Sequence, residues 1–434
     1  MSTTVSEVLS FVRENDVKFI RLAFCDLFGR QKNISIMPQE LSAALAGGAS
    51  FDASAVTGFS DVSHSDLFLR PDPDTLALLP WRPQRGRVAR FYCDILSPDG
   101  SPFERDPRGI LRRALDRFSS SGYSLKAGAE CEFYLFKTDE NGCASYDPLD
   151  NGGYLDVSPL DKGENVRREI CLDLERMGIQ PESSHHEQGP GQNEIDFKFS
   201  GALACADNLV TFKTAVRTIA AMNGLFASFM PKPLAGRSGS GMHINISLFK
   251  NGRNVCETEG AEAFGSFIAG VLEKSAEITA FLNPIANSYE RLGVCEAPRY
   301  ISWSRENRSQ LIRIPAANGE RVRMELRSAD PAANPYIALA LIISAGLWGI
   351  QQGLKLPEPV NADLYRAETA GALPSLPMDL SEAVQAASHS GFAREVLGSS
   401  TFEKFIELKR REAADFCKAG DKQAFYAERY FPVI

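Results

Sequence analysis

The segment 97–107 is dense in Pro, Gly, Asp and Ser, and it divides the 434-residue chain into two parts with different patterns. Such clusters of turn-forming residues interrupt regular structure. Before this segment, amphipathic and alternating patterns predict one helix over 4–15 and strands over 18–25, 31–37, 75–79 and 87–95. A chain of this length is sufficient for two or three domains. We therefore predict a small, strand-rich N-terminal domain over 1–100 and a larger domain over 101–434.

The larger part alternates between helical and strand-like patterns. Apolar spacing predicts helices over 107–119, 163–177, 206–229, 261–280 and 335–353. Strands are predicted between these helices, over 130–136, 193–199, 242–249 and 321–327. No internal repeat or low-complexity tract interrupts this order. The mixture predicts a second domain of α/β or α+β type.

The segment 331–354 carries no charge and is nearly all apolar from Tyr336 to Ile350, so its length approaches that of a membrane span. However, Asn334 and Pro335 open the apolar run, and Gln351 and Gln352 close it. Only about 15 apolar residues remain, which is shorter than a spanning helix requires. We predict a buried core helix that begins at Pro335, where proline is favoured, and no membrane association.

Composition and charge exclude several classes of protein. The net charge of −8 argues against a nucleic-acid binder, which needs clustered Lys and Arg. The nine Cys are dispersed, odd in number and never in a CxxC pair, so a disulfide framework or zinc ribbon is not expected. The first residues show no basic segment followed by an apolar one, so no signal peptide is predicted. These features favour a reducing cytoplasm.

Glu130 and Glu132 lie two positions apart in a predicted strand, so their side chains share one face, with Cys131 on the other. A solvated strand face would explain this pattern in many proteins. Here the apolar run 133–136 follows at once, which predicts a central strand. Carboxylates in a central strand need partners, and we interpret the pair as metal ligands.

His243, Asn245 and Ser247 share one face of the predicted strand 242–249 in the same way. A single histidine is more often a hydrogen-bonded core residue than a ligand. The preceding residues 238–241, Ser-Gly-Ser-Gly, favour a ligand site because glycines let the backbone approach a bound molecule closely.

Three arginines alternate with one glutamate in the predicted strand 321–327, as Arg321, Arg323, Glu325 and Arg327. Guanidinium groups around one carboxylate fit a site that binds phosphate and substrate carboxylate, with a metal ion held by Glu325. An exposed, charged edge strand would explain the pattern equally well.

Six side chains able to bind metal are spread between positions 130 and 325, namely Glu130, Glu132, Glu187, Glu194, His243 and Glu325. Oxygen ligands with one imidazole suit Mg²⁺ or Mn²⁺, ions that handle phosphates. His185 and His186 beside Glu187 match no zinc signature. The chain has no P-loop, and its glycine-rich segment 236–241 precedes a strand, which argues against a dinucleotide-binding turn.

Short motifs that follow one another through nearly the whole chain carry a family resemblance. They occupy 51–54, 130–136, 153–154, 185–187, 191–194, 239–243, 287–292, 296–298, 307–309, 312–315 and 330–336. In this order they resemble the glutamine synthetase family, in particular its bacterial type I group. The resemblance implies an α+β fold, with a small β-grasp-like N-terminal domain and a large catalytic domain built on a curved antiparallel sheet.

The resemblance also implies how the metal ligands divide. One ion would be held by Glu132, Glu187 and Glu194, and another by Glu130, His243 and Glu325, with two to three Mg²⁺ or Mn²⁺ ions in a site. ATP would be a co-substrate rather than a resident cofactor.

Further residues match the substrate and nucleotide positions of the family. The substrate would contact Tyr154, Ser238, Gly239, Arg291, Glu296 and Arg327. ATP would contact Glu182, Phe199, Asn245, Ser247, Arg308, Arg313 and Arg323. Asp52, Glu296 and Arg308 would take part in catalysis: Asp52 in deprotonating ammonium, Glu296 in closing a flap over the site, and Arg308 in neutralising the transferred phosphoryl group.

The reaction implied is ligation of ammonium to the γ-carboxylate of glutamate. That carboxylate attacks the ATP γ-phosphate, and ammonia displaces phosphate from the resulting acyl phosphate, which the closed flap protects from water. In this family two six-membered rings stack into a dodecamer, and the N-terminal domain of one subunit completes the site of its neighbour. Asp52 would then act on a neighbouring subunit.

Several positions depart from the family pattern and keep other functions open. The loop 291–296 is one residue shorter than usual and lacks Pro-Gly-Tyr. Ser238 replaces a common Asn, Asn245 a usual His, Ala55 a usual Ser and Glu320 a usual Lys. The residues that match the metal-binding and phosphate-binding positions of the family are intact. The positions that match the acceptor-binding and amine-binding parts of the site differ. Ligation of an organic amine such as a polyamine, and a non-catalytic regulatory role, are the alternatives to glutamine synthesis.

Overall fold

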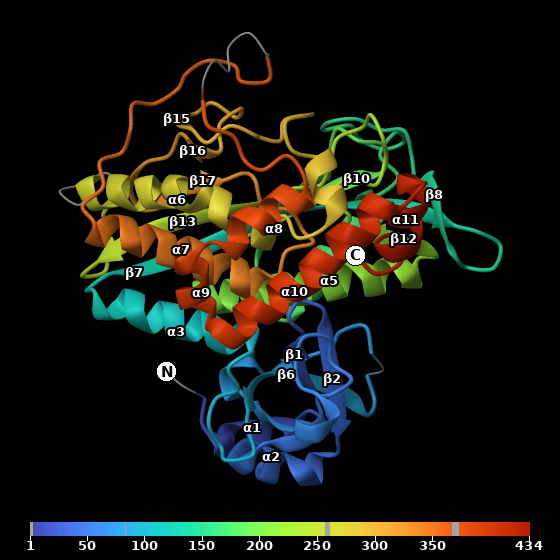
Figure 1. Ribbon diagram of the computed structural model, residues 1–434. Coiled ribbons are helices and arrows are strands. Elements are labelled where there is room, and N and C mark those ends of the chain that lie inside the picture. The colour runs from blue at the N-terminus through green and yellow to red at the C-terminus, as the bar shows by residue number, and fades with distance from the viewer. Residues whose placement is uncertain (1–2, 83, 257–260, 367–372) are drawn as a thin grey trace.

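The computed structural model describes residues 3–82, 84–256, 261–366 and 373–434. The chain forms a small N-terminal part, drawn in blue, beneath a larger part that contains all the remaining elements (Figure 1). Each part has its own cluster of buried apolar side chains. This two-part, α+β arrangement agrees with the predicted fold class.

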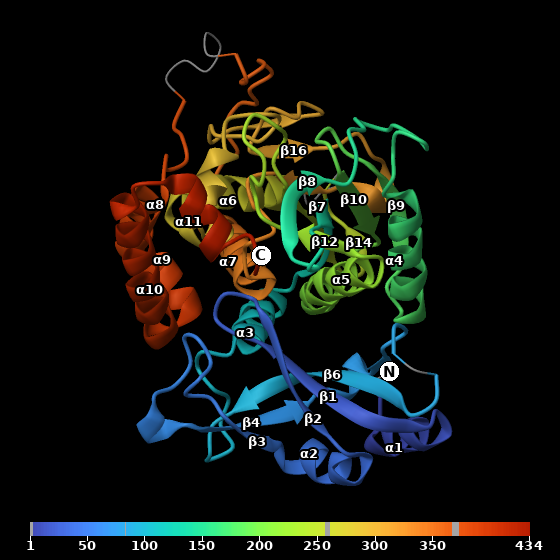
Figure 2. The same ribbon diagram turned by 90° about the vertical axis from the view of Figure 1, so that its right-hand side faces the viewer.

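The N-terminal part is a six-stranded sheet with two helices on one face. Its strands run in the order β2 (Gln31–Ile36), β1 (Val17–Cys25), β6 (Arg87–Leu96), β4 (Asp66–Pro71) and β3 (Ala49–Asp52), with β5 (Ala77–Leu78) also paired to β6. The β1–β6 pairing is parallel and the others are antiparallel. Helices α1 (Val5–Glu14) and α2 (Leu41–Gly47) cover the face that points away from the larger part (Figure 2).

The larger part is organised around an eleven-stranded sheet with a long central strand, β7 (Ser124–Thr138). The main path is β15 (Trp303–Arg305), β16 (Ile312–Ile314), β17 (Met324–Leu326), β13 (Met242–Lys250), β7, β10 (Gln192–Phe197) and β9 (Pro181–His186). Four short strands complete it: β8 (Ala144–Pro148), β11 (Ser200–Gly201), β12 (Leu225–Ser228) and β14 (Arg253–Asn254). The position of β7 confirms that Glu130 and Glu132 lie in a central strand.

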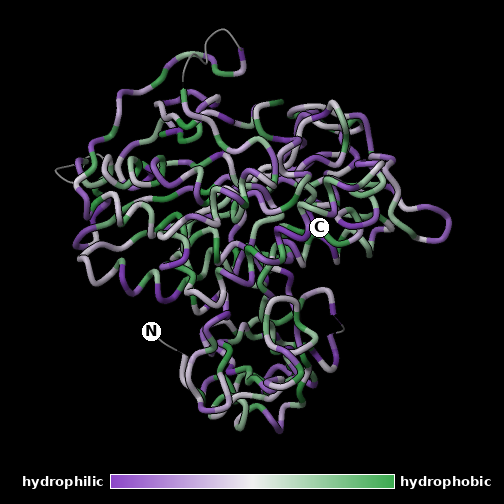
Figure 3. The backbone as a smooth tube through the Cα atoms, in the orientation of Figure 1, coloured by the Kyte–Doolittle hydropathy of each residue, from purple (hydrophilic) through white to green (hydrophobic). Residues whose placement is uncertain are grey.

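Helices pack against this sheet and against one another. They are α3 (Pro107–Ser120), α4 (Glu164–Arg176), α5 (Ala202–Met222), α6 (Ala261–Leu282) and α7 (Pro335–Gln351), with α8 (Leu380–Ser388), α9 (Gly391–Leu397), α10 (Ser399–Lys418) and α11 (Lys422–Arg429) along one side (Figure 2). Apolar residues concentrate where these helices meet the sheet (Figure 3).

Helix α7 is the buried core helix predicted from the uncharged segment. It begins at Pro335, and the Asn334 side chain caps it by accepting hydrogen bonds from the backbone N–H groups of Tyr336 and Ile337. Gly270 of α6 and Gly349 of α7 lie back to back, so a Cβ on either would meet the backbone of the other helix. In the described part of the chain, no helix is long and apolar enough to cross a membrane. No disulfide bond is present among the described residues.

Three predicted elements differ clearly from those observed. The predicted helix over 206–229 is wrong at its end, because α5 stops at Met222. Gly224 then adopts a φ of 69°, and β12 pairs with β7 instead. The predicted strand over 75–79 is reduced to β5, because Pro73 and the capping Asp72 fold 73–75 into a short 3₁₀ turn.

The predicted strand over 321–327 is also shorter than expected. Only Met324–Leu326 is extended and paired, and Arg321 ends a 3₁₀ turn that starts at Gly319, where φ is 60°. The alternation therefore holds for Arg323, Glu325 and Arg327, while Arg321 is exposed.

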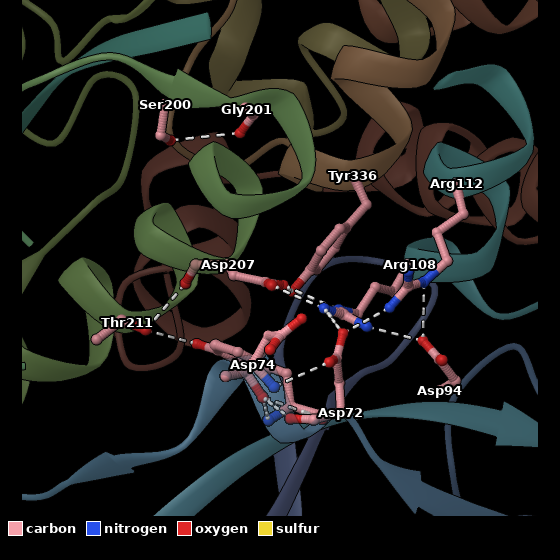
Figure 4. Close-up of polar contacts among 12 residues, drawn as sticks. Asp72, Asp74, Asp94, Arg108, Arg112, Ser200, Gly201, Asp207, Thr211 and Tyr336 are labelled. Atoms are coloured by element: carbon pink, nitrogen blue, oxygen red, sulfur yellow. Dashed lines mark hydrogen bonds and ion pairs between the residues drawn. The ribbon is translucent and has the colours of Figure 1, made fainter. Parts of the chain in front are cut away.

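One buried arginine joins the two parts of the molecule. Arg108, near the start of α3, contacts Asp207 of α5 at 2.9 Å, and Asp72 and Asp94 of the N-terminal part at 2.8 and 2.7 Å (Figure 4). Tyr336 of α7 donates a hydrogen bond to the same Asp207 at 2.6 Å. The guanidinium is 5 % exposed, so all three ion pairs are protected from solvent. This cluster fixes the N-terminal sheet against the helices that support the site.

Candidate active site

Strand register brings the predicted metal ligands together on one face of the large sheet. Across β7 and β13, Glu130 pairs with His243, and across β7 and β10, Glu132 pairs with Glu194. Glu325 of β17 lies opposite Asn245 of β13, one step further along the sheet. Residues on one face of neighbouring strands lie within side-chain reach. Ligands separated by almost two hundred residues of sequence therefore share one surface.

Glu130, His243 and Glu325 form the first compact group. One ligand atom from each lies within 4.8 Å of the others, as the division of ligands predicted. His243 Nδ1 is 3.2 Å from Glu130 and 3.5 Å from Glu325. Burial would raise the pKa of Glu130, but hydrogen bonds from His243 and Asn245 outweigh it and lower that pKa to about 2. The group thus presents an ionised carboxylate beside an imidazole.

The second compact group of ligand atoms consists of His185, Glu187 and Glu194, whereas the ligand set that the resemblance implies has Glu132 in place of His185. His185 Nε2 lies 2.9 Å from Glu187 and 3.6 Å from Glu194. Glu132 stands beside this group and accepts hydrogen bonds from Gln192 Nε2 at 2.9 Å and from the Gly241 backbone N–H at 3.0 Å. His185 and Glu194 come together because β9 and β10 pair at those residues.

The charges around Glu194 suit a divalent cation. Burial, together with the nearby carboxylates of Glu132 and Asp196, raises the pKa of Glu194 well above its ordinary value. Burial also raises the pKa of Glu132, and Glu187 adds to this effect. Crowded, buried carboxylates resist ionisation unless a positive charge is present. Oxygen donors with an imidazole are a donor set that Mg²⁺ and Mn²⁺ accept, so the residues present fit such ions.

A cavity of about 380 Å³ opens over both groups. Its lining contains all six predicted metal ligands together with Tyr154, Ser238, Gly239, Arg291, Glu296, Arg308, Arg313, Arg323 and Arg327. The polar character of this lining and its size are appropriate for a small charged substrate. All of the predicted substrate-binding residues therefore border one cavity.

Two buried arginines that were predicted to bind substrate, Arg291 and Arg327, line this cavity. Arg327 donates to Glu325 at 2.6 Å, while its Nε is buried with no hydrogen-bond partner among the described residues. Arg291 is 3 % exposed and donates to the backbone carbonyls of Ser328 and Arg327 at 2.8 and 3.1 Å. Fixed guanidiniums in a partly closed cavity are well suited to binding carboxylate or phosphate oxygens.

The glycines before β13 allow the chain to pass close to Arg291. A Cβ at Gly239 would lie 2.9 Å from Arg291 Cγ, and one at Gly241 would lie 2.6 Å from its Nη2. These glycines therefore have a steric role, since any larger residue would displace the arginine.

A second cavity of about 300 Å³ adjoins the first. It is lined by the predicted nucleotide residues Glu182, Phe199, Asn245, Ser247 and Arg323, among others. Glu130, Asp196 and Arg323 line both cavities. The exposed ring of Phe199 lies 4.9 Å from Lys126 Nζ, an apolar and cationic surface on which a base could stack. Arg308 and Arg313, predicted for the nucleotide, lie in the first cavity.

The loop between Arg291 and Ala297 is a compact turn beside the first cavity. Gly293, Cys295 and Glu296 have φ angles of 83°, 47° and 67°. The loop is closed by a hydrogen bond from the Gly293 N–H to the Ala297 carbonyl at 3.0 Å, and the Ala297 N–H donates to the Val294 carbonyl at 3.2 Å. Non-glycine residues rarely adopt positive φ, and such strain is often found in functional loops. Arg327 Nη2 contacts the Glu296 carbonyl at 3.4 Å, so the loop touches the substrate end.

Asp52 is the predicted site residue that borders neither cavity. It is exposed at the end of β3, where it accepts hydrogen bonds from the Ser54 hydroxyl at 2.7 Å and the Ser54 N–H at 2.9 Å. These bonds, the hydroxyl first, lower the pKa of Asp52. A single chain does not place this carboxylate at the metal groups.

The polar residues of the site that were missing from the predicted set include His185, Gln192 and Asp196. Asp196 lies two positions beyond Glu194 in β10 and borders both cavities, so strand alternation alone could have identified it. Gln192 precedes Glu194 by two positions in the same way. His185 carried no zinc-like spacing, and only its pairing with Glu194 reveals its place.

Tyr365 also contacts the segment that carries Arg308. Its hydroxyl donates a hydrogen bond to the Arg308 carbonyl at 2.9 Å. The ring is 38 % exposed, and burial raises the pKa of this phenol to about 12. The contact holds the backbone of the segment that carries Arg308.

Comparison with known proteins agrees with this geometry. Residues 16–98 match the family model for the glutamine synthetase β-grasp domain, and residues 104–427 match that for the catalytic domain. Glutamine synthetase from Clostridium saccharobutylicum is 45 % identical over 95 % of this chain and 96 % of its own, and that from Methanosarcina mazei is 46 % identical over 94 % of each. A solved structure of GmaS with ADP is 31 % identical, covers 99 % of both chains and has a TM-score of 0.88. The protein is a member of the glutamine synthetase family and thus an enzyme of a ligase family.

Proposed function

We propose that this enzyme ligates ammonium to the γ-carboxylate of L-glutamate with ATP, giving glutamine, ADP and phosphate through a γ-glutamyl phosphate. The observation that carries the proposal is the meeting of the two cavities at Glu130, Asp196 and Arg323. A nucleotide in the second cavity would direct its phosphates toward this junction, and an amino acid in the first would direct its carboxylate toward the same point. Phosphoryl transfer requires this approach.

The two acidic groups would hold two to three Mg²⁺ or Mn²⁺ ions. Glu130, His243 and Glu325 would bind one ion near the nucleotide, and Glu187, Glu194 and His185 would bind another. Glu132 lines the same cavity and would share the second ion. Such ions neutralise phosphate oxygens and lower the barrier to transfer.

Arginines would neutralise the remaining charge. We assign Arg291 and Arg327 to substrate oxygens, because they are buried at the substrate end of the first cavity. Arg308 and Arg313 line the same cavity and would face the transferred phosphoryl group. The loop that carries Glu296 would cover the acyl phosphate and exclude water.

The ammonium end requires a second copy of the chain. Asp52 borders neither cavity of its own chain, and its lowered pKa keeps an exposed negative charge that attracts a cation. We propose a ring assembly, a dodecamer of two hexamers, in which Asp52 of one subunit completes the site of the next. Asp52→Ala and Arg323→Ala should each inactivate the enzyme. Co-expression of the two variants should restore activity, because some sites would then contain both native residues; failure to restore it would exclude shared sites.

Ligation of an organic amine is the second candidate. It is favoured by the similarity to GmaS, a γ-glutamylmethylamide synthetase, over 99 % of both chains, and by the shortened loop 291–296, which contains the exposed Cys295. The curated relatives at 45–46 % identity are named glutamine synthetases, which favours ammonium.

Activity assays of the purified protein with Mg²⁺, ATP and glutamate distinguish these reactions. Phosphate release and the amide product should be measured with ammonium, methylamine and a polyamine at equal concentrations of the free base. Glutamine formation with the highest kcat/KM for ammonium supports the proposal. A higher kcat/KM for methylamine or a polyamine would show that the second candidate, ligation of an organic amine, is the reaction. ATP binding without turnover of any amine would indicate a regulatory protein.

A further inference from the structure

Arg299 follows the loop 291–297 by two residues, and its side chain returns to contact that loop. Arg299 Nη2 donates a hydrogen bond to the Leu292 carbonyl at 2.7 Å, and Nη1 lies 3.2 Å from Met378 Sδ. A Cβ at Gly293 would lie 2.7 Å from Arg299 Nε, so the loop backbone packs directly on the guanidinium. The φ of Gly293 is 83°, which glycine adopts readily. The loop therefore bends around this one side chain.

The guanidinium of Arg299 has unusual partners for a half-buried charge. Within the described part of the chain it forms no ion pair with a carboxylate, and its Nε is buried without a hydrogen-bond partner. Buried donors without partners are rare in folded proteins and call for an explanation. A guanidinium that only stabilised the fold would gain more from an acidic partner. The contacts of Arg299 go instead to the loop and to Met378.

The backbone of Arg299 is fixed by the segment 374–376. The Leu376 N–H donates to the Arg299 carbonyl at 2.9 Å, and the Ile301 N–H donates to the Pro374 carbonyl at 2.8 Å. An antiparallel bridge joins the two segments between these bonds. Arg299 therefore projects from a fixed base, and its side chain connects this base to the loop.

The loop itself is exposed and strained at the edge of the first cavity. Cys295 and Glu296 line that cavity, are exposed, and have φ angles of 47° and 67°. Among the described residues, two side chains from outside the loop donate to its backbone, Arg299 at 2.7 Å and Arg327 at 3.4 Å. Positive φ in non-glycine residues persists only where surrounding contacts impose it. Loss of the shorter contact would let the loop relax away from the cavity.

We propose that Arg299 is a positioning residue, which keeps the loop 291–297 closed over the first cavity and so directs the acyl phosphate to the amine rather than to water. This role rests on the proposed formation of γ-glutamyl phosphate, whichever amine accepts the acyl group. When the amine attacks, a C–N bond forms, the bond from the acyl carbon to the phosphate oxygen breaks, phosphate leaves with the electron pair, and the amine loses a proton. When water attacks the same carbon, a C–O bond forms, and glutamate and phosphate return without an amide.

The number of phosphates released per amide formed measures this role. Each protein is assayed with Mg²⁺, ATP, glutamate and the amine that it prefers. Arg299→Met should raise this number about two- to tenfold, a range below the full worth of one hydrogen bond from a charged group, and the excess phosphate should require glutamate. Because both products come from the same folded molecules, a smaller folded fraction alone leaves the number unchanged. Arg299→Lys keeps a donor and should restore part of the coupling.

Two further variants sharpen the comparison. Arg253→Met is the matched control, because Arg253 is exposed in β14 and lines neither cavity of the active site. It should release the native number of phosphates per amide. Gly293→Ala should release excess phosphate, as Arg299→Met does, because the added Cβ would displace the guanidinium.

Alkylation of cysteines by iodoacetamide, followed by mass spectrometry, examines the loop without turnover. In Arg299→Met the rate at Cys295 should rise about twofold or more relative to the exposed Cys143 and Cys417, because a released loop opens locally. These two cysteines are internal controls for the fold.

The outcomes separate the role of Arg299 from the proposed reaction. An unchanged number of phosphates per amide in an active enzyme, an unchanged relative rate at Cys295, or excess phosphate without glutamate would each overturn the role of Arg299 and leave the reaction in place. If the native protein releases no glutamate-dependent phosphate with any amine, the proposed function is overturned, and the role of Arg299 with it.

Discussion

Asn245 donates a hydrogen bond to Glu130, with 3.0 Å between Nδ2 and Oε1, and thereby joins the two cavities of the active site. Its Oδ1 accepts a hydrogen bond from Arg323 Nε at 2.8 Å. Glu130 in turn lies 3.2 Å from His243 Nδ1. A continuous polar chain therefore runs from the nucleotide side to the first metal group. Bonds between fixed, partly charged groups reinforce one another in a site shielded from water.

Asn245→Ala should lower kcat/KM for ATP about 10- to 100-fold, because two hydrogen bonds to charged groups are lost, each worth about 1.5 to 3 kcal/mol before rearrangement. Steady-state kinetics with varied ATP measure the effect. Asn141→Ala is the control, since Asn141 is exposed in the turn that precedes β8. An equal reduction of kcat/KM for ATP in both variants would show that Asn245 has no specific part in nucleotide binding.

His243→Asn should weaken Mn²⁺ binding by about tenfold or more, as changes around metal ligands commonly do. The imidazole belongs to the compact group with Glu130 and Glu325. The increase in Tm on adding Mn²⁺ reports the affinity without turnover. His389→Asn, at an exposed histidine after α8, should keep the full increase. A normal metal response in His243→Asn would contradict the assignment.

Arg108→Met should destabilise the fold by about 3 to 5 kcal/mol, because removing one partner leaves buried carboxylates uncompensated. Arg108 is 5 % exposed and contacts Asp72, Asp94 and Asp207. Arg112 contacts two of the same carboxylates but is 39 % exposed, so Arg112→Met should cost only about 0 to 1 kcal/mol. Urea unfolding of both variants measures their free energies of unfolding. A similar loss of free energy in the two variants would show that burial of Arg108 is unimportant.

Asp106 should make stability fall as pH rises from about 4 to 7. Burial, with the nearby Asp94 carboxylate, raises the pKa of Asp106 to about 7, whereas the unfolded chain releases this proton near an ordinary pKa of about 4. The folded state therefore holds the extra proton in that window. The stabilising contribution of protonated Asp106 to the folded state is complete below about pH 4 and is lost as the pH passes 7.

Asp106→Asn isolates this effect. Asparagine also caps helices, and it can keep the hydrogen bond from the Arg108 N–H, although not the bond from Ile95 N–H. The variant should be less stable overall, but its free energy of unfolding should fall less between pH 5 and pH 8 than that of the native protein. Parallel pH profiles for the two proteins would show that Asp106 does not titrate in this range.

Local patterns predicted much of the fold. The alternation of Glu130 and Glu132, and of His243 and Asn245, placed each pair on one strand face because a strand has a period of two. The uncharged run was recognised as a core helix from its flanking polar residues. Errors arose where local patterns are ambiguous: α5 ends at Met222 because Gly224 turns the chain, and an apolar pattern continues across that turn.

Which side chains meet in the two compact acidic groups could not be predicted from the residues alone. His185 joins Glu194 because β9 and β10 pair at these positions, while the Gly241 backbone and Gln192 draw Glu132 aside.

The sequence by itself determined the kinds of chemical groups, the faces on which they lie and the family to which the chain belongs, since these depend on residue identity and short-range periodicity. Only the tertiary structure decided which groups meet. Strand register brought Glu325 beside His243 and Glu130, and left Asp52 at the edge of the N-terminal sheet, outside both cavities of its own chain. The physical reason is that pairing between distant segments is fixed by the packing of the whole core, which no local pattern encodes.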